Sequence, residues 1–569
     1  ALIGGDYQGK GIVPTSEKTY FHSTAFVTAD ALTSGDGGKV ILWADDATYF
    51  YGGISASGGL QSGNGGFVET SGKQYLDFGG RVDVAAYNGI GGTVLLDPVS
   101  ITILAGTDSN STGFTAGSDI AELFADDSAV VGTVLDPTAT TGSFAGISAG
   151  STIILQATDF ITVSDAFNLA TATGSAANNL VMQAGGSINI NNDLTLDGIG
   201  TLHLEADTSH NGGADGTGAI NFASGTTTTL GGGMTLIAAD FSIVGAITGG
   251  ANDVAIAQSQ TGQAFALGSA GSSLITDTEL DQITTTGTIT LGQATSAGAS
   301  GSGSGTLLTA GAITANGFSQ AKLSFISGST VSLGATTLTG NLSITSGAAI
   351  TQTGALVVPG TTTISAAGFD VTLANTGNNF TGAVAVTGAN VQLVDAGAID
   401  LGASTITGTL AVTATAGGDI TDSAAISVGG TSTFTAANGR SVTLDSASTY
   451  TGAVSFVGTT LANVTINNSG AFVIGALTLT GDLSVTAGGA VSQSGALAIT
   501  GTTTVSASGF DVALSDAMNN FVGAVGITGN NVSVVDAGDL VLGDSTVGGT
   551  YAATATAAGD ITNTGALAI

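Results

Sequence analysis

A column of apolar residues recurs through the C-terminal half of the chain and predicts stacked β-strands. Glycines stand at positions 340, 360, 382, 408, 430, 452, 481, 501, 523 and 549, each before a short β-like segment. Four positions after them lie only apolar residues: Ile344, Ile364, Val386, Val412, Phe434, Phe456, Val485, Val505, Ile527 and Ala553. Five positions after them a hydroxyl is the rule: Thr345, Ser365, Thr387, Thr413, Thr435, Thr486, Ser506, Thr528 and Thr554, with Val457 as the exception. Because adjacent strand residues point to opposite faces, the first column should face a core and the second should face solvent.

The spacing of these glycines predicts the architecture. They lie on average about 23 residues apart, which is the length of one coil of a β-solenoid. A single coil cannot bury its apolar column, but coils stacked about 4.8 Å apart can. About 25 such coils would form a rod on the order of 120 Å long. We therefore predict an all-β chain folded as a parallel β-helix.

Longer repeats run through the same region. The segment 354–358 returns as 495–499, at an offset of 141, and 380–384 returns in weaker form as 450–454, at an offset of 70. We expect three coils in each half-repeat and expect the two 141-residue copies to superpose. Ile364 and Val505 should then fill equivalent core sites, as should Phe369 and Phe510. The pairs Asn378-Asn379 and Asn519-Asn520 favour turns or stacked amides.

The first hundred residues have a different texture. They contain Ala1-Leu2-Ile3-Gly4-Gly5-Asp6, then Gly37-Gly38-Lys39-Val40-Ile41-Leu42-Trp43, then Gly65-Gly66-Phe67-Val68-Glu69-Thr70-Ser71-Gly72 and Gly92-Thr93-Val94-Leu95-Leu96-Asp97-Pro98. This string resembles the filamentous-haemagglutinin-like exoproteins of two-partner secretion, where their N-terminal β-helix ends. The resemblance covers about a sixth of the chain. It implies a right-handed β-helix, export through an outer-membrane secretion barrel, and roles in adhesion or surface structure. The Asn-Pro-Asn-type motifs expected upstream are missing, which leaves the export route open.

Three regions are expected on this basis. Residues 1–98 would end the filamentous-haemagglutinin-like β-helix, since proline at Asp97-Pro98 stops ladder pairing. Residues 99–330 would be a less regular β-solenoid with loop insertions, including a flexible loop at 298–305. Residues 331–569 would carry the 141-residue repeat and continue beyond the C-terminus. Trp43 should be a core anchor.

Composition narrows the partners. The chain holds 41 acidic and 7 basic residues, a net charge of −34, and five of the basic residues lie before position 82. Nucleic acid and anionic membranes require clustered Lys and Arg, so neither is expected as a partner. Acidic side chains leave weak surface calcium as an option. The absence of cysteine excludes disulfides and thiolate chemistry but is compatible with an extracellular location.

Candidate chemistry is sparse, and we predict no catalytic, cofactor-binding or metal-binding residues and no enzyme activity. A lyase would need cationic side chains, but only Lys322 and Arg440 lie beyond position 81. Arg440 is interpreted as a neutral substitution in a turn, since the sister repeats have phenylalanine at that place. The carboxylate pairs Asp45-Asp46 and Asp126-Asp127 would point to opposite faces of a strand. The three histidines, at positions 22, 203 and 210, lack metal-ligand spacing.

Two functions from different classes fit these patterns. One is a non-catalytic extracellular β-helical exoprotein that acts as an adhesin-like stalk at the bacterial outer surface. The other is a self-assembling structural subunit of a filament or sheath. Its partners would be a host or matrix glycan or protein, or further copies of the chain, with no small-molecule substrate. Because neither terminus resembles a cap, we expect the native chain to extend beyond both ends.

Overall fold

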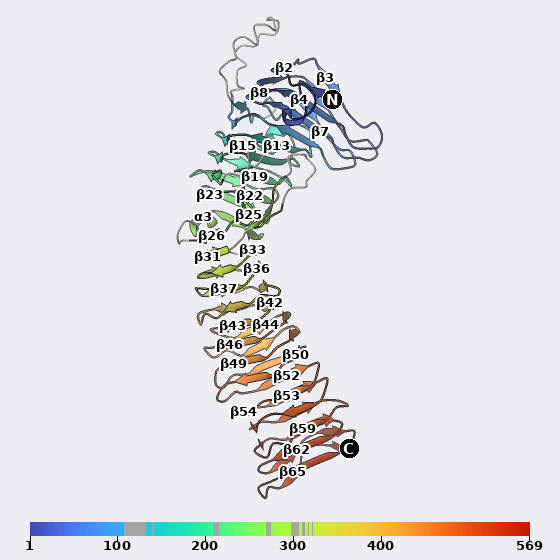
Figure 1. Ribbon diagram of the computed structural model, residues 1–569, viewed down its shortest axis with the longest axis vertical. Helices are drawn as coiled ribbons and strands as arrows, with labels where there is room; N and C mark the ends of the chain where they lie inside the picture. Colours follow the sequence, from blue (N-terminus) through green and yellow to red (C-terminus); the bar gives the residue numbers. More distant parts are fainter. Residues whose placement is uncertain are drawn as a thin grey trace. The chain divides into compact units, whose positions relative to one another are not determined.

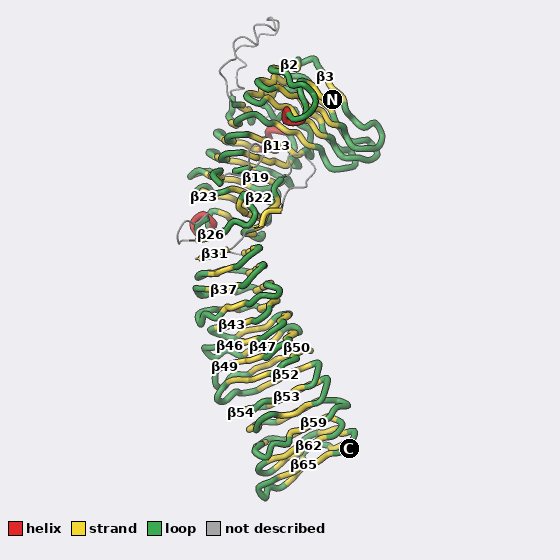
Figure 2. Tube along the Cα trace, in the orientation of Figure 1, coloured by secondary structure: helices red, strands yellow, loops and turns green. Residues whose placement is uncertain are grey.

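The computed structural model describes residues 1–106, 132–138, 141–208, 216–268, 275–297, 307–309, 313–316, 318–320 and 322–569. The segments proposed as a flexible loop at 298–305 and as a carboxylate pair at 126–127 lie outside these residues, as does position 210. By contacts the chain divides into two units, Ala1–Gly311 and Ala312–Ile569. Both are built almost entirely of short strands joined by turns (Figures 1 and 2).

The first unit stacks parallel strands on three sides of a coil. One side holds β1 (Leu2–Ile3), β4 (Lys39–Ala44), β7 (Phe67–Gly72), β10 (Thr93–Leu96), β13 (Thr152–Ala157), β16 (Asn179–Ala184), β19 (Leu202–Glu205), β22 (Met234–Ala238), β25 (Val254–Gln258) and β28 (Ile289–Leu291). The second side holds β2 (Lys18–Phe21), β5 (Ala47–Phe50), β8 (Tyr75–Phe78), β12 (Thr133–Leu135), β11 (Ile101–Ile103), β14 (Ile161–Val163), β17 (Ile188–Ile190), β20 (Ala219–Phe222) and β23 (Asp240–Ile243). The third side holds β3 (Phe26–Thr28), β6 (Gly53–Ser55), β9 (Arg81–Asp83), β15 (Phe167–Asn168), β18 (Leu194–Thr195), β21 (Thr227–Thr229), β24 (Ala246–Gly250) and β27 (Ile283–Thr285).

A few elements of this unit depart from the coil. They are η1 (Tyr7–Gly9), α2 (Leu169–Thr173), α3 (Asp277–Leu280) and the antiparallel pair β29 (Gln293–Thr295) and β30 (Leu307–Thr309), whereas β26 (Phe265–Gly268) is itself a strand of the coil. The helix α3 begins with a capping box, in which Thr276 and Glu279 satisfy each other's backbone N–H groups. These elements lie outside the stack of coil strands, and η1 and β29 pack against strands of the first side.

The second unit has the same plan. The first side holds β33 (Leu323–Ser327), β36 (Leu342–Ser346), β39 (Thr362–Ser365), β42 (Val384–Gly388), β44 (Ile399–Leu401), β45 (Ser404–Ile406), β47 (Ile420–Asp422), β48 (Ile426–Val428), β50 (Val442–Tyr450), β52 (Val464–Asn468), β55 (Leu483–Ala487), β58 (Thr503–Ser506), β61 (Val525–Gly529), β63 (Leu540–Leu542), β64 (Ser545–Val547), β66 (Ile561–Asn563) and β67 (Leu567–Ala568). The second side holds β31 (Ile313–Asn316), β34 (Val331–Leu333), β37 (Ile350–Gln352), β40 (Val371–Leu373), β43 (Val391–Asp395), β46 (Leu410–Ala414), β49 (Ser432–Ala436), β51 (Val454–Val457), β53 (Phe472–Ile474), β56 (Val491–Gln493), β59 (Val512–Leu514), β62 (Val532–Asp536) and β65 (Tyr551–Ala555). The third side holds β32 (Phe318–Gln320), β35 (Thr336–Leu338), β38 (Leu356–Val358), β41 (Asn379–Phe380), β54 (Leu477–Leu479), β57 (Leu497–Ile499) and β60 (Asn520–Phe521).

The pairing pattern confirms a parallel β-helix. Each strand of the coil pairs with the strand one coil further along, as in the parallel pairs β36–β39 and β39–β42. Parallel strands require crossover connections, and here the other two sides of the coil provide them. The right hand of the helix stays a prediction from the family resemblance.

The two columns predicted from the glycine spacing lie on the faces expected of them. Eight of the ten apolar positions are buried, while Phe456 and Ala553 are half-buried. None of the ten positions of the hydroxyl column is buried, and Val457 is exposed. The alternation of apolar and hydroxyl residues therefore marks the inside and the outside of the coil.

The mean glycine spacing turns out to be an average over two kinds of step. In the second unit the length of a coil varies, since Val384 stacks on Leu401 whereas Val357 stacks on the more distant Asn379. The strand after Gly382 stacks on β39, whereas the strand after Gly408 stacks on β43 in another sheet. A longer glycine step therefore contains one coil plus the passage to the next side. The half-repeat holds three coils and part of a fourth, which corrects the count of three.

The two 141-residue copies match, with one correction. Ile364 and Val505 are both buried, as predicted. Phe369 and Phe510 are also equivalent, but they are 44% and 45% exposed and do not belong to the core. Each follows a left-handed glycine, at φ +82° in both copies, and its N–H closes a tight turn. A glycine turn at this place projects the next side chain outward.

Candidate functional site

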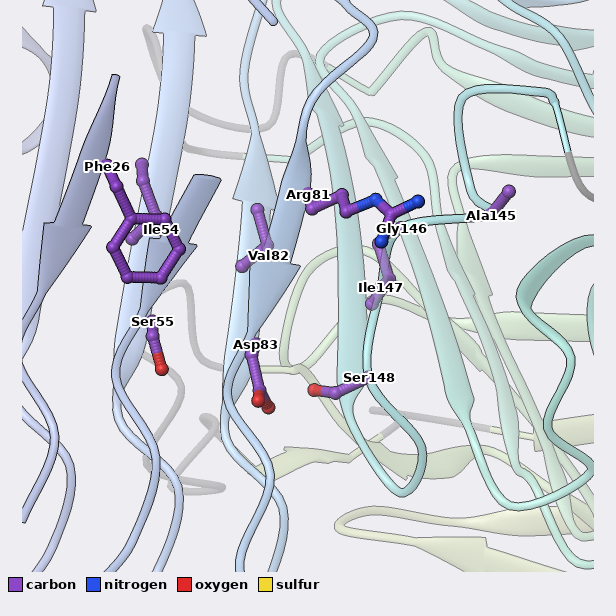
Figure 3. A pocket seen from close by; sticks show the side chains of 10 residues that line it. All are labelled: Phe26, Ile54, Ser55, Arg81, Val82, Asp83, Ala145, Gly146, Ile147 and Ser148. Atoms are coloured by element: carbon purple, nitrogen blue, oxygen red, sulfur yellow. The ribbon is translucent and has the colours of Figure 1, made fainter. Parts of the chain in front are cut away.

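A hollow of about 420 Å³ lies on the outer face of the β3–β6–β9 sheet in the first unit (Figure 3). Phe26 pairs with Gly53, and Gly53 pairs with Arg81, so these residues form one row across the three strands. The segment 145–148 lies along the far edge of β9. There the Val82 N–H donates to the carbonyl of Gly146 at 2.9 Å, and the Ser148 N–H donates to the carbonyl of Val82 at 3.1 Å.

Two glycines shape the floor of this groove. A Cβ atom at Gly53 would lie 2.5 Å from Cδ2 and 2.7 Å from Cε2 of Phe26 but 3.8 Å from Cγ, so the edge of the ring points at that glycine. A Cβ atom at Gly146 would lie 2.9 Å from Cγ of Arg81, and Figure 3 shows the Arg81 side chain extending toward that residue. Phe26 remains 66% exposed. The groove therefore offers an exposed aromatic ring and a guanidinium group.

Polar groups of the groove divide into those used by the fold and those left over. The Ser148 hydroxyl accepts from the Val84 N–H at 2.9 Å, and the Ser55 hydroxyl donates to Asp30 at 2.6 Å. Asp83 Oδ1 accepts from the Ala85 N–H at 3.0 Å. Among the described residues, the Arg81 side chain has neither an ion pair nor a hydrogen bond. The donors of Arg81 and the second oxygen of Asp83 are thus available to a ligand.

A second polar cluster is buried under the N-terminal segment. Residues 5–9 cover the outer face of β4, where Trp43 is 4% exposed. A Cβ atom at Gly5 or Gly9 would lie within 2.7 Å of the indole, which explains the glycines there. Trp43 is therefore a buried anchor as predicted, but it holds the N-terminal segment onto the outside of the coil.

Two buried carboxyl groups lie in this cluster. The Gln8 N–H donates to Glu69 at 3.1 Å, and Gln8 Nε2 donates to Gln156 at 2.6 Å. Burial raises the pKa of Glu69 to about 8, although the hydrogen bond from Gln8 opposes the shift. Burial likewise raises the pKa of Asp97 to about 7, and the charge of Lys10 opposes that shift.

On the same face, polar side chains of successive coils are hydrogen-bonded to one another and form a ladder along the unit. Gln156 Nε2 donates to Gln183 at 3.2 Å, and Gln183 Nε2 donates to Glu205 at 2.8 Å. Glu205 also meets His203 Nε2 at 3.3 Å and accepts from the Ser296 hydroxyl. Burial alone would raise the pKa of Glu205, but these hydrogen bonds outweigh it and lower the value. The ladder fixes the strands to the segments that cover them and leaves no open site.

The second unit repeats a buried polar network at the junction between its sides. Asn378 Nδ2 donates to Gln352 at 3.0 Å, and Asn378 Oδ1 accepts from the Leu356 N–H at 2.9 Å. Asp395 accepts from the Phe380 N–H at 2.6 Å. The second 141-residue copy makes the same bonds with Gln493, Asn519 and Asp536. These asparagines are buried amides that bind neighbouring coils together.

The middle copy makes the same backbone contacts with other residues. Ser448 accepts from the Ile426 N–H at 2.9 Å, and Asn468 accepts from the Tyr450 N–H at 2.9 Å. Asp422 takes the place of the glutamine, accepting from the Ser446 N–H at 3.3 Å. Its second oxygen is buried without a hydrogen-bond partner among the described residues. Burial raises the pKa of Asp422, and of Tyr450 as well.

The remaining residues considered from sequence do not meet in one site. Asp45 and Asp46 lie in a bend rather than in a strand, which corrects the strand assignment; Asp46 meets Lys18 at 3.8 Å. His22 contacts the nearby Thr24 hydroxyl at 2.9 Å. Lys322 and Arg440 are exposed.

Arg440 follows the left-handed Gly439, and its N–H closes a turn on Ala437. This is the turn that Phe369 and Phe510 occupy in the sister copies, as predicted.

Sequence reasoning missed the groove and the buried carboxyl groups. The groove joins residues far apart in the chain, and no local pattern marks it. The ladder had a signal in the recurring triplets Leu155-Gln156-Ala157, Met182-Gln183-Ala184 and Leu204-Glu205-Ala206. A polar residue kept at the same place in successive coils indicates a stacked, hydrogen-bonded column.

No group of three potential metal ligands occurs in the described part of the chain. Within the same residues, no helix has the length and apolar character needed to cross a membrane. Four stretches of the second unit, 320–387, 388–457, 461–528 and 529–569, match the family described as "Repeats of unknown function (DUF5649)". A comparison with curated proteins finds no match to the chain. The first three stretches agree in length with the half-repeat.

Proposed function

We propose that this chain is part of a non-catalytic, extracellular β-helical protein that acts as an adhesin-like stalk at a bacterial surface. The main support is the structural role of the repeated polar residues. In each half-repeat of the second unit they bond one coil to the next, as Asn378 and Asn519 do. Residues repeated in this way build and stiffen a spacer.

Further observations support this role. The outward column of hydroxyl side chains and the net charge of −34 suit a solvated surface that resists aggregation. The groove beside Arg81 provides one surface with unused polar groups on such a spacer. The resemblance of the first hundred residues to filamentous-haemagglutinin-like exoproteins supports an extracellular location and export through an outer-membrane barrel.

Antibody labelling of intact cells tests the proposal. Antibodies raised against residues 320–569 should label non-permeabilised cells that make the protein, and trypsin added to those cells should remove the signal. Deletion of the gene should reduce attachment of the cells to a host or matrix surface. Labelling only after permeabilisation, or unchanged attachment, would exclude the adhesin-like role.

A further inference from the structure

We propose that the groove between Phe26 and Arg81 binds a pyranose ring of a neutral glycan. This inference rests on the proposed function and names the ligand of one surface. The Cδ2–Cε2 edge of the Phe26 ring meets Gly53, and the side chain is 66% exposed, so the ring offers an aromatic face to solvent. An open aromatic face packs against the apolar C–H face of a sugar, which the ring's negative face attracts.

The polar groups beside the ring match sugar hydroxyls. Arg81 and Asp83 are two residues apart on β9, both exposed, and so lie on the same face of the strand. The guanidinium group has several donors in a fixed plane, and the free Asp83 oxygen is an acceptor. A hydroxyl group both donates and accepts, so adjacent hydroxyls of one sugar can satisfy both residues.

The charge around the groove favours a neutral ligand. Arg81 and Asp83 face it and Asp30 lies beside it on Ser55, so the groove has no net positive charge to attract an anion. The chain as a whole carries a charge of −34, and its negative potential opposes the approach of an anionic sugar or nucleic acid.

The backbone beside the groove disfavours an extended peptide. A peptide strand would need the free edge of β9, but residues 146–148 already occupy that edge through the hydrogen bonds with Val82. Only side chains, among them an aromatic ring, remain available to a ligand at this surface. The edge of β9 lacks the unpaired N–H and C=O groups that an added peptide strand would bond. A glycan, which binds through its hydroxyl groups and the C–H face of its rings, therefore suits this surface better than an extended peptide does.

Isothermal titration of the full chain with lactose, cellotetraose, mannotriose and chitotetraose tests the inference. At least one of these should bind at a single site. Phe26→Ala and Arg81→Gln should each weaken that binding roughly tenfold or more, since each removes a buried contact of the complex. Tyr87→Ala and Lys73→Gln are matched controls, because they remove an exposed aromatic ring and an exposed cation elsewhere in the first unit and should leave binding unchanged.

Several results would overturn the inference. They are the absence of binding by all four sugars, binding that both groove variants retain, and tighter binding of tetragalacturonate than of cellotetraose. Capture of a peptide through Arg81 in place of any sugar would assign the groove to a peptide. Circular dichroism of each variant confirms that it folds. If a sugar binds through Arg81 but intact cells are not labelled, the glycan site stands and the surface role falls.

Discussion

Between Val386 and Thr387 the strand β42 passes from core to solvent within one residue. Val386→Asp should cost several kcal/mol, from lost burial of about 1.5–3 kcal/mol plus the penalty of a buried carboxylate. Thr387→Asp should change the free energy of unfolding by no more than about 1 kcal/mol, because its side chain points outward. Urea unfolding of both variants measures the difference. An equal loss of stability at the two positions would contradict the assignment of Val386 to the core and of Thr387 to the solvent face.

The carboxyl group of Glu69 makes the first unit sensitive to pH. Its pKa is about 8 in the folded chain and near 4.5 when exposed, so between these values the unfolded state binds fewer protons. Stability should therefore fall as the pH rises from about 4.5 to 8, by at most about 1.4 kcal/mol per pH unit for one proton. Asp97, whose pKa is raised to about 7, acts in the same direction.

The single tryptophan provides the measurement, since Trp43 lies directly under the N-terminal segment. Thermal melts followed by its fluorescence should shift downward between pH 5 and pH 8 by several degrees. Glu69→Gln keeps the size and an acceptor for the Gln8 N–H but cannot ionise, so its melts should depend less on pH. An unchanged pH dependence in this variant would show that another group titrates.

At this scale the sequence identified the facing of side chains but not their ionisation. The alternation at Ile344 and Thr345 is local and follows from strand geometry alone. The burial of Glu69 could not be derived in this way, because its strand neighbours place it on an outer face. Only the segment around Gln8, which is distant in the sequence, covers it.

We expect the middle half-repeat to be the least stable of the three that carry the buried network. Asp422 and Ser448 are shorter than the glutamine and asparagine at the same places in the sister copies. The hydrogen bond between those two side-chain amides is therefore absent in the middle copy. A buried polar atom without a partner costs about 1–3 kcal/mol. The double variant Asp422→Gln with Ser448→Asn should therefore stabilise the chain by an amount in that range.

Chemical unfolding of the whole chain measures this gain. The reverse change in the next copy, Gln493→Asp with Asn519→Ser, is the matched control and should destabilise by a similar amount. A loss of stability in the Asp422→Gln double variant would mean that the middle copy has adapted its packing to the smaller residues. The proposed equivalence of the three networks would then be wrong.

Strands and repeats were predictable because both are periodic. The shift of the glycine column from one side of the coil to the next was not, since the steps after Gly382 and Gly452 look like long coils in sequence. The groove was also out of reach. Phe26, Gly53 and Arg81 come together only when the number of residues in each coil is known.

For the whole molecule, the open question is whether copies act singly or assemble. A net charge of −34 repels other copies, but the repulsion acts over a Debye length of only about 8 Å at physiological salt. A stalk should remain monomeric as salt is raised, since its outward faces carry hydroxyl groups that water satisfies. A subunit of a filament should associate more strongly with added salt or calcium, which screen or bridge the acidic side chains. Sedimentation velocity of the full-length native protein from low to high salt, with and without calcium, separates the two. Monomers under all conditions would exclude the filament, and salt- or calcium-driven polymers would replace the stalk with a self-assembling structure.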